Sequence, residues 1–369
     1  MEQNIFSVDS GAVEKINAIL RKIHSEKVLL VCDGAFSFLP VSKEIERLVV
    51  PYAVFSSFTP NPVYEDMCRG VEVFNREKCD TVLAIGGGSA MDVAKCVKLY
   101  NRMDGSRNYL EQEIIPNRTE IIAVPTTAGT GSESTRFAVI YYKGEKQSIS
   151  DESLIPKYVI LCSELLQTLP DYHRKATMLD ALCHGIESFW SVNSTRESRD
   201  YSEKAVRMIL EHMNAYLGNT EDGNRNMLVA SNFAGKAINL TQTTAGHAMC
   251  YKLTSIYGIA HGHAAALCLP KIWNYMLHHI DDCIDPRGQD YLKSTFEELS
   301  FILTGEKGLF AGCDQFNSIL SGLDLSVPVL TSEEELQVLA KSVNPVRLKN
   351  NPVRLSEDVL KGLYREILG

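Results

Sequence analysis

The stretch TVLAIGGGSAMDVAKCVKLY, residues 81–100, decides the fold. Its opening run is apolar and β-branched, which predicts a buried strand, and the residues from Ala90 onward follow a helical pattern. Three glycines and a serine at 86–89 lie between the two. Glycine lets a backbone approach a ligand closely, and a helix start offers free N–H groups with a partial positive charge. The stretch therefore predicts either an anion site or a plain tight turn, because it is neither GxGxxG nor a P-loop.

Similar strand patterns lie on both sides of this stretch, and helical patterns lie between the first of them. The runs that read as strands are VLLVC (28–32), YAVF (52–55), TVLAI (81–85), IIAVP (121–125), FAVIYY (137–142) and YVILC (158–162). Alternation of this kind is typical of a parallel sheet wrapped in helices. After Leu169 the strand patterns stop, and helices are expected at 174–192, 198–216 and 226–240. The sequence thus predicts an α/β nucleotide-binding domain at 1–167 and an all-α domain at 168–369.

A second loop rich in small residues, VPTTAGTGSES (124–134), follows another predicted strand. Its hydroxyl groups and glycines allow it to wrap a ligand, and two such loops at the ends of parallel strands suit a dinucleotide. A flexible surface loop is the alternative. Asp33 follows the first of these strands, where a carboxylate favours NAD(H) over NADP(H), although an ordinary turn aspartate reads the same way.

Composition excludes several classes of protein. The 369 residues are 45% hydrophobic and 22% charged, as in ordinary globular domains, and 37 basic against 46 acidic residues give a net charge of −9. That balance argues against nucleic acid or an anionic membrane as the main partner. No segment reads as a signal peptide or a membrane span, and the ten cysteines show no CxxC pair. We expect a cytoplasmic protein with reduced, mostly buried thiols.

The histidines point to a metal site. Eight of the nine fall between residues 173 and 279, and Asp180 and His184 share one face of a predicted helix. With His247 and His261 they offer one carboxylate and three imidazoles, a set that suits Fe(II) or Zn(II) and leaves a position open for substrate. His263 is left out of this set because it faces another side if a helix begins at His261. Cys183 and Cys250 could bind a softer metal, but packing is the more frequent role of buried thiols.

These motifs together resemble the iron-containing (group III) alcohol dehydrogenases over nearly the whole chain. GGGSAMDVAK, PTTAGTGSE, DALCHGIES and the histidine segment ending in LCLP stand in that family's order and spacing. The resemblance implies a nucleotide-binding α/β domain and a helical domain, with metal and nicotinamide meeting in the cleft between them. It places the metal ligands at Asp180, His184, His247 and His261. The cofactor contacts that it implies are Gly87, Gly88, Ser89, Asp92, Thr126, Thr127, Ser132 and Lys146.

Within the family, the sequence looks most like the branch that reduces phosphonoacetaldehyde to 2-hydroxyethylphosphonate. The cations available to hold a phosphonate are Arg136, Lys252, Arg347 and Arg354, although each reads equally well as a surface charge. Many family members carry a proton-relaying histidine four residues after the third ligand, where this chain has Tyr251. We therefore expect Tyr251, or a water held near it, to donate the proton. The family is commonly dimeric or larger, so a homo-oligomer is expected.

The hypothesis is a metal-dependent NAD(P)H oxidoreductase, in which the metal at His261 and its partners polarises an aldehyde and the nicotinamide delivers hydride. Its nearest alternatives are a simple-alcohol or glycerol-type dehydrogenase and the lyase dehydroquinate synthase. A metal-dependent hydrolase is the alternative from another class, since the glycines would then form only a turn. A non-catalytic NAD-sensing protein would have little use for an open metal site.

Overall fold

The computed structural model describes residues 3–369, which divide into two compact units. The first runs to Leu169 and also includes Gly218–Asn232, and the second consists of Pro170–Leu217 and Phe233–Gly369. The first boundary lies close to the expected one. The returning segment differs from the single boundary expected, and polar contacts within the first unit explain it: Arg225 pairs with Asp9 at 2.6 Å, and Asn232 donates to the Ser134 hydroxyl at 2.6 Å.

A six-stranded parallel sheet forms the centre of the first unit, which confirms the predicted fold class. Its strands, in the order β1-β8-β5-β4-β2-β3, are Asn4–Val8, Tyr158–Cys162, Glu120–Pro125, Thr81–Gly86, Val28–Cys32 and Tyr52–Phe55. The central strands are buried along their whole length, as expected for strands covered on both faces. Sequence patterns missed β1 because polar residues interrupt its short apolar run.

The run FAVIYY was predicted as part of this parallel sheet, and that prediction is wrong. It forms β6 (Phe137–Tyr142), which pairs antiparallel with β7 (Glu145–Ser150) in a separate two-stranded sheet. Lys143 and Gly144 join the strands with φ angles of 53° and 79°. Two left-handed residues are what a tight two-residue hairpin turn requires.

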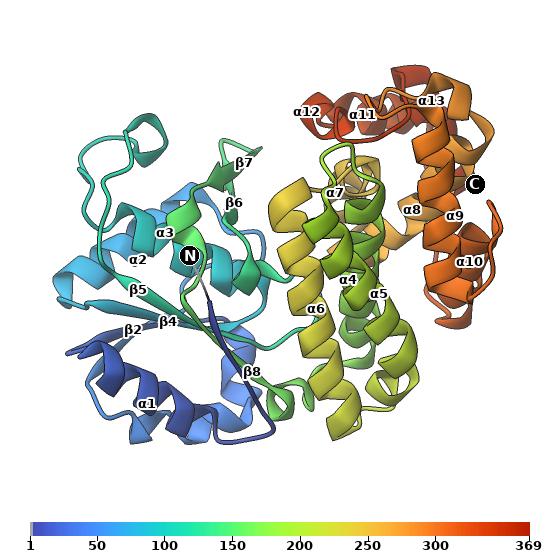
Figure 1. Ribbon diagram of the computed structural model, residues 1–369. Coiled ribbons are helices and arrows are strands. Elements are labelled where there is room, and N and C mark those ends of the chain that lie inside the picture. The colour runs from blue at the N-terminus through green and yellow to red at the C-terminus, as the bar shows by residue number, and fades with distance from the viewer. Residues whose placement is uncertain (1–2) are drawn as a thin grey trace. The chain divides into compact units, whose positions relative to one another are not determined.

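Helices cover both faces of the sheet. Helix α1 (Ala12–Ile23) lies on one face, and α2 (Tyr64–Arg76) and α3 (Gly88–Tyr100) lie on the other (Figure 1). Val13, Ile16 and Leu20 of α1 are fully buried against strand residues such as Leu30 and Ile85. This packing forms the hydrophobic core on the α1 face of the sheet.

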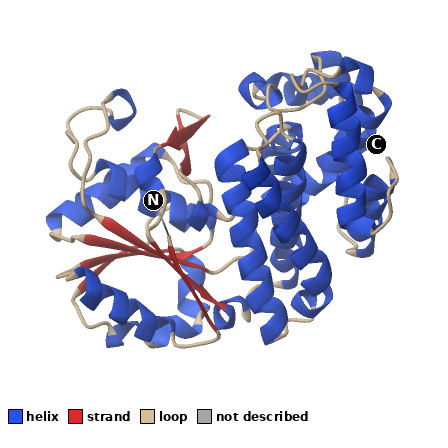
Figure 2. Ribbon diagram, viewed as in Figure 1, coloured by secondary structure: helices blue, strands red, loops and turns tan. Residues whose placement is uncertain are grey.

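The second unit is helical, and Figure 2 shows no strand in it among the described residues. The helices from Asp171 onward are α4 (Asp171–Trp190), α5 (Arg196–Leu217), α6 (Glu221–Thr241), α7 (Ala245–Tyr257), α8 (His261–His278), α9 (Gln289–Thr304), α10 (Ala311–Gly322), α11 (Glu333–Ser342), α12 (Pro345–Leu348) and α13 (Glu357–Leu368). The three helices predicted by periodicity correspond to α4, α5 and α6. Within residues 3–369, no helix has the length and apolar character needed to cross a membrane.

Candidate functional site

The glycine turn and the hydroxyl-rich loop lie side by side in the first unit. A Cβ added to Gly87 would lie 3.5 Å from the Thr127 side chain, and one added to Gly88 would lie 3.1 Å from Thr130. The amide of Thr126 also donates to the Gly86 carbonyl at 3.1 Å. Gly87, Gly88 and Ser89 remain partly exposed at the start of α3. The turn therefore combines an accessible helix N-terminus with a backbone that side chains do not cover.

Asp33 lies next to this turn. A Cβ on Gly86 would be 3.1 Å from Asp33 Oδ2, so the end of β2 places the carboxylate beside the end of β4. The other oxygen, Oδ1, accepts a hydrogen bond from the Ala35 amide at 2.9 Å and caps a short 3-10 helix. Asp33 thus has a structural role in the turn and one oxygen directed toward the glycines.

Lys95 is a buried cation that the sequence analysis did not single out. Its Nζ donates to three backbone carbonyls, those of Ser132 (2.6 Å), Thr135 (2.8 Å) and Phe137 (2.8 Å), and contacts the hydroxyls of Ser132 and Thr135. Burial lowers its pKa to about 8, which still leaves the ammonium mostly charged at pH 7. Lys95 therefore ties α3 to the hydroxyl-rich loop, and a charged residue on an otherwise apolar helix face was the signal available in the sequence.

Asp92 and Lys146 belong to the same neighbourhood. Burial raises the pKa of Asp92 to about 7, against the opposing charges of Lys95 and Lys146. Ser132 Oγ lies 3.5 Å from Asp92 Oδ1. The structure thus brings Asp92, Ser132 and Lys146, all expected cofactor contacts, into one cluster in the first unit.

In the second unit, the side chains of Asp180, His247 and His261 converge. Their ligand atoms all lie within 4.8 Å of one another, and Asp180 and His247 are almost completely buried. His184 stacks on His247 with ring centroids 4.3 Å apart and an interplanar angle of 14°. Oxygen and imidazole nitrogen at this spacing suit one divalent ion. All four expected ligands therefore come from α4, α7 and α8 of a single unit.

The electrostatics of this cluster call for positive charge at its centre. His247 Nε2 lies 3.3 Å from Asp180 Oδ1. Burial acts to lower the pKa of His247, but the charges of Glu187 and Asp180 outweigh it and raise the pKa to about 9. Burial likewise acts to raise the pKa of Asp180, yet the neighbouring histidines hold it well below its usual range. A cation shared by these groups fits the donor set.

A glycine allows the helices that carry these ligands to meet. A Cβ on Gly262 would lie 2.1 Å from the Ala176 carbonyl oxygen and 2.6 Å from Asp180 Cβ, so no side chain fits there. The start of α8 is also held by Tyr172, whose hydroxyl accepts from the Ala260 amide at 2.8 Å and contacts His263 Nδ1 at 3.2 Å. His263 is therefore engaged with Tyr172 on α4.

Glu187 is a site residue that the sequence analysis missed. It is fully buried, and its Oε2 forms a short hydrogen bond with His247 Nδ1. Burial acts to raise its pKa, but the charge and hydrogen bond of His247 outweigh burial and hold the pKa below its ordinary value. The available signal was spacing, because Glu187 follows Asp180 by seven residues and His184 by three on α4, which places all three on one helical face.

Tyr251 and Arg347 extend the site from His261. The Tyr251 ring stacks on His261 with centroids 5.2 Å apart, and burial raises the pKa of its hydroxyl, so the phenol is protonated at neutral pH. Arg347 is close enough for its charge to act on that hydroxyl, and its Nη1 donates to Gln242 Oε1 at 3.0 Å. Gln242 adopts a left-handed backbone with φ of 60°, an uncommon conformation for glutamine.

The remaining cations and thiols occupy other environments. Arg136 pairs with Glu152 at 2.8 Å in the first unit. Lys252 is half-buried on α7, and Arg354 is exposed after α12. Cys250 Sγ lies 3.4 Å from His261 Nδ1 and donates to the His247 carbonyl at 3.3 Å. None of the ten cysteines forms a disulfide within residues 3–369.

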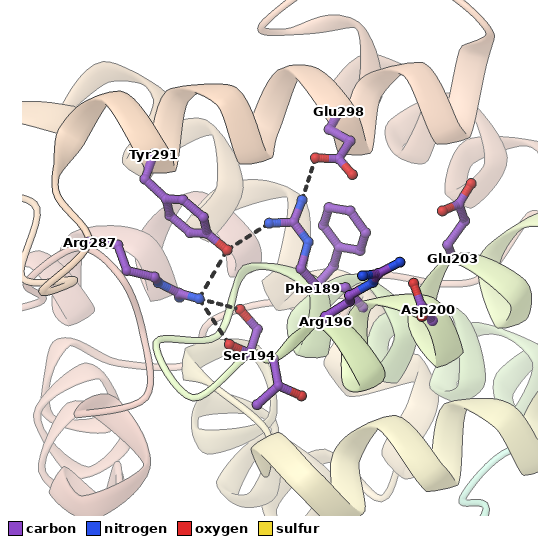
Figure 3. A pocket seen from close by; sticks show the side chains of 10 residues that line it. Phe189, Ser194, Arg196, Asp200, Glu203, Arg287, Tyr291 and Glu298 are labelled. Carbon is purple, nitrogen blue, oxygen red and sulfur yellow. Dashed lines mark hydrogen bonds and ion pairs between the residues drawn. The ribbon is translucent and has the colours of Figure 1, made fainter.

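An open cavity of about 400 Å³ lies elsewhere in the second unit, between the end of α4, the start of α5 and α9 (Figure 3). Figure 3 shows the Tyr291 hydroxyl beside the Arg287 guanidinium, which donates to it at 3.0 Å. Arg199 Nη1 donates to the same hydroxyl at 2.7 Å. Arg199 also pairs with Glu298, and Arg287 also donates to Ser194 Oγ. Both arginines are thus held by hydrogen bonds and an ion pair within the protein, which indicates that they join α4, α5 and α9 structurally.

A glycine-rich helix start in a parallel α/β unit and a carboxylate–imidazole cluster in a helical unit are the features of a metal-containing, nucleotide-dependent dehydrogenase. The sequence pattern described as "Iron-containing alcohol dehydrogenase" matches residues 4–163, and the C-terminal pattern of the same family matches residues 175–368. The chain therefore belongs to the iron-containing alcohol dehydrogenase family and is an aldehyde–alcohol oxidoreductase.

Relatives with known names span several substrates. The chain is 31% identical to phosphonoacetaldehyde reductase of Streptomyces viridochromogenes, covering 78% of this chain and 76% of the relative. It is 30% identical to NAD-dependent methanol dehydrogenase of Bacillus methanolicus, covering 73% and 74%. The structure of sulfoacetaldehyde reductase from Bifidobacterium kashiwanohense in complex with NAD+ is similar, with a TM-score of 0.86, 26% identity, and coverage of 100% of this chain and 97% of that one.

Proposed function

We propose that this protein reduces an aldehyde to a primary alcohol with NADH, and runs the reverse reaction with NAD+, at a divalent metal ion held by Asp180, His184, His247 and His261. The observation that carries the proposal is the convergence of the ligand atoms of Asp180, His247 and His261, of which the first two residues are buried and His261 is half-buried. We favour Fe(II) because of the family, with Zn(II) accepting the same ligands. When bound, the metal supplies a Lewis acid that polarises the aldehyde oxygen.

The chain's own residues then orient and protonate the substrate. Tyr251 stacks on His261, so its hydroxyl lies beside the ligand set and can donate a proton to the product oxygen. Replacing it with phenylalanine keeps the stacking and removes only that hydroxyl. We expect Tyr251→Phe to lower kcat by about 10²-fold with metal content unchanged. An unchanged kcat would transfer the role to water.

NAD(H) is proposed to bind at the glycine turn of the first unit, with Gly87, Gly88 and Ser89 at its phosphates and Asp33 at its ribose. The Asp33 carboxylate would repel the extra phosphate of NADP(H). Asp33→Asn keeps an acceptor for the Ala35 amide and removes only the charge. It should raise the ratio of kcat/KM for NADPH over NADH by at least about tenfold, or about 1.4 kcal/mol. An unchanged ratio would leave Asp33 as a helix cap.

The substrate is proposed to be an aldehyde that carries a phosphonate or sulfonate group, such as phosphonoacetaldehyde. Two relatives are named for such aldehydes, and Arg347 is the candidate cation whose charge reaches Tyr251. Gln242 Oε1 accepts from its Nη1, and we propose that other N–H groups of the guanidinium bind the anion. A simple-alcohol or glycerol-type substrate is the alternative, and it would need no cation at this point.

Two matched variants test the substrate. The motif NPVRL occurs at 344–348 and again at 351–355, so Arg354→Gln is a control for Arg347→Gln. A charge-assisted hydrogen bond contributes about 1.5–3 kcal/mol, so Arg347→Gln should lower kcat/KM for phosphonoacetaldehyde by roughly 10- to 100-fold. Rates with acetaldehyde should not change. Equal losses for both aldehydes, or a fully active Arg347→Gln, would favour the simple-alcohol alternative.

The reaction class is tested by stoichiometry in the wild-type protein. Oxidation of one NADH for each alcohol formed, abolished by chelation and restored by Fe(II) or Zn(II), is the expected result. Turnover of a substrate without any change in NADH would instead support the metal-dependent hydrolase alternative.

A further inference from the structure

Glu187 stands at the end of a chain of buried polar groups whose hydrogen-bond directions can be deduced. Trp190 Nε1 lies 3.0 Å from Thr244 Oγ1, and Thr244 Oγ1 lies 2.8 Å from Glu187 Oε1. The indole N–H can only donate, so the Thr244 oxygen accepts from Trp190 and its own proton points to Glu187. The His247 backbone amide donates to the same carboxylate oxygen at 3.2 Å. Glu187 Oε1 therefore receives two donors.

The second oxygen of Glu187 determines the state of His247. Oε2 contacts His247 Nδ1, and a carboxylate can only accept, so Nδ1 carries the proton. The other nitrogen, Nε2, faces Asp180 Oδ1 at 3.3 Å and is the one available to a metal. A neutral imidazole has one N–H and one lone pair, so fixing the proton on Nδ1 fixes the lone pair on Nε2.

The packing around Glu187 holds it in this position. Trp190 packs edge-on against Trp273, with centroids 5.2 Å apart, so the first donor of the chain is itself fixed. A Cβ on Gly246 would lie 2.6 Å from Glu187 Oε1, so the residue before His247 must be glycine for the carboxylate to fit. Glu187, Thr244 and His247 are each at most 1% exposed. Water therefore has little access to replace any of these hydrogen bonds.

We propose that Glu187 is a positioning residue that locks His247 in the Nδ1–H form and so sets the metal affinity of the site, with Thr244 and Trp190 orienting Glu187. This inference rests on the metal site of the proposed function. It assigns to Glu187 no contact with substrate, cofactor or metal. Carboxylates of this kind that hydrogen-bond a metal-ligating histidine typically change metal affinity by 10- to 100-fold when removed.

Glu187→Gln tests the proposal because the amide has almost the same shape. If its NH₂ faces His247, Nδ1 must accept, the imidazole proton moves to Nε2, and that nitrogen can no longer bind a metal. If its oxygen faces His247, the NH₂ meets the two donors from Thr244 and the His247 amide. Either arrangement disfavours the ligating form, so the dissociation constant for Co(II) should rise roughly 10- to 100-fold.

The measurement is a Co(II) titration of the full-length protein after metal removal, followed by visible absorption, which reports the ligands of the ion. Glu211→Gln, at an exposed residue of α5, controls for loss of one negative charge. Thr244→Ser keeps the hydroxyl and should bind Co(II) like the wild type, whereas Thr244→Val should fall between wild type and Glu187→Gln. If Glu187→Gln does not fold, the two Thr244 variants still test the hydrogen bonds that orient Glu187.

The outcomes separate this inference from the proposed function. If the wild type binds no Co(II), the metal site itself is wrong. If the wild type and Glu187→Gln bind Co(II) equally, while the variant only melts at a lower temperature with and without the ion, Glu187 has a packing role and the inference is wrong. Equal Co(II) affinities of Thr244→Ser and Thr244→Val would show that the Thr244 hydroxyl does not help to orient Glu187.

Discussion

The two units each bury charged side chains, but the partners of these side chains differ. In the first unit, protein oxygens surround the Lys95 ammonium, and three backbone carbonyls accept hydrogen bonds from it at 2.6–2.8 Å. In the second unit, the carboxylate of Asp180 and the Nε2 of His247 lie 3.3 Å apart, and both can bind a shared metal ion once Nε2 has given up its proton. A buried charge whose hydrogen-bond partners are all protein groups stabilises the fold, whereas ligand atoms that converge on one point can also bind a metal ion.

The largest effect should come from removing one of the proposed metal ligands in the second unit. His261→Ala should abolish both metal retention and turnover, since a lost Lewis acid removes several kcal/mol of transition-state stabilisation, or at least about 10³-fold in rate. Metal analysis of the purified variant and NADH-coupled assays measure this. His278→Ala, at an exposed histidine on the same helix, is the control and should retain both properties. Full turnover by His261→Ala in metal-free buffer would remove the metal from the reaction.

Removing the buried Lys95 ammonium should lower the stability of the first unit and leave the metal site intact. Lys95→Met removes one donor from each of three carbonyl oxygens, of which that of Ser132 keeps the Thr135 amide at 3.1 Å. At about 1–3 kcal/mol for each carbonyl left unsatisfied, we expect a loss of roughly 3–5 kcal/mol in the free energy of unfolding. Denaturant melts measure it, with Lys43→Met, at an exposed lysine, as the control. The metal content of the folded variant should stay normal. A Lys95→Met protein that stays stable but loses its metal would contradict the idea that Lys95 stabilises the fold and has no role in metal binding.

A smaller change can disturb the metal site without removing a ligand. The Cβ of Gly262→Ala would lie 2.1 Å from the Ala176 carbonyl oxygen, so α8 must move away from α4 and carry His261 with it. Overpacking of this kind loses about 1–3 kcal/mol of stability, and the affinity for Co(II) should fall as well. Gly362→Ala, within α13 and with open space around it, should gain about 0.5–1 kcal/mol. Normal Co(II) affinity in Gly262→Ala would show that the ligands tolerate this shift.

Sequence patterns predicted the parallel sheet because each central strand is a β-branched run that ends at turn residues. They could not predict the order β1-β8-β5-β4-β2-β3, since strand pairing depends on contacts between distant residues. The β6–β7 hairpin was missed because Lys143-Gly144 is not one of the usual two-residue turn pairs, such as Asn-Gly, although both residues adopt positive φ. In the site, helical spacing paired Asp180 with His184, whereas the position of His261 beside them depends on the approach of α8 to α4 at Gly262. His247 comes from a third helix, α7, whose packing spacing along the sequence does not give.

The buried partners were harder to predict than the ligands. A glutamate on an amphipathic helix normally faces solvent, so only the i, i+4, i+7 spacing from Asp180 marked Glu187 as different. Lys95 follows Asp92 by three residues, a spacing that suggests only an ion pair along the helix, whereas its hydrogen-bond acceptors are backbone carbonyls between residues 132 and 137. Backbone acceptors leave no trace in side-chain identity, and for that reason sequence alone could not place this contact.

The smallest expected effect concerns Asp80, an exposed carboxylate. It shows how much stability a surface carboxylate contributes when protein donors hydrogen-bond both of its oxygens. It accepts from the amides of Glu26 and Lys27 and from the hydroxyls of Ser25 and Thr81. Partial burial acts to raise its pKa, but these hydrogen bonds outweigh it and hold the pKa below the ordinary value of 3.8. A carboxyl with a lowered folded-state pKa stabilises the protein above the unfolded pKa, and this contribution is lost as the pH falls through the folded value.

Asp80→Asn should therefore destabilise the protein by about 1 kcal/mol or less at pH 7, since solvent screens an exposed group. The difference from the wild type should shrink as the pH falls below about 4, because the wild-type carboxyl then becomes protonated and loses its advantage. Denaturant melts of both proteins at pH 7 and at the lowest pH where they remain folded measure this change. A difference that does not depend on pH would mean that Asp80 acts through the geometry of its hydrogen bonds, which asparagine disturbs equally in both protonation states. Neither result should alter Co(II) affinity, because the partners of Asp80 are complete without an ion.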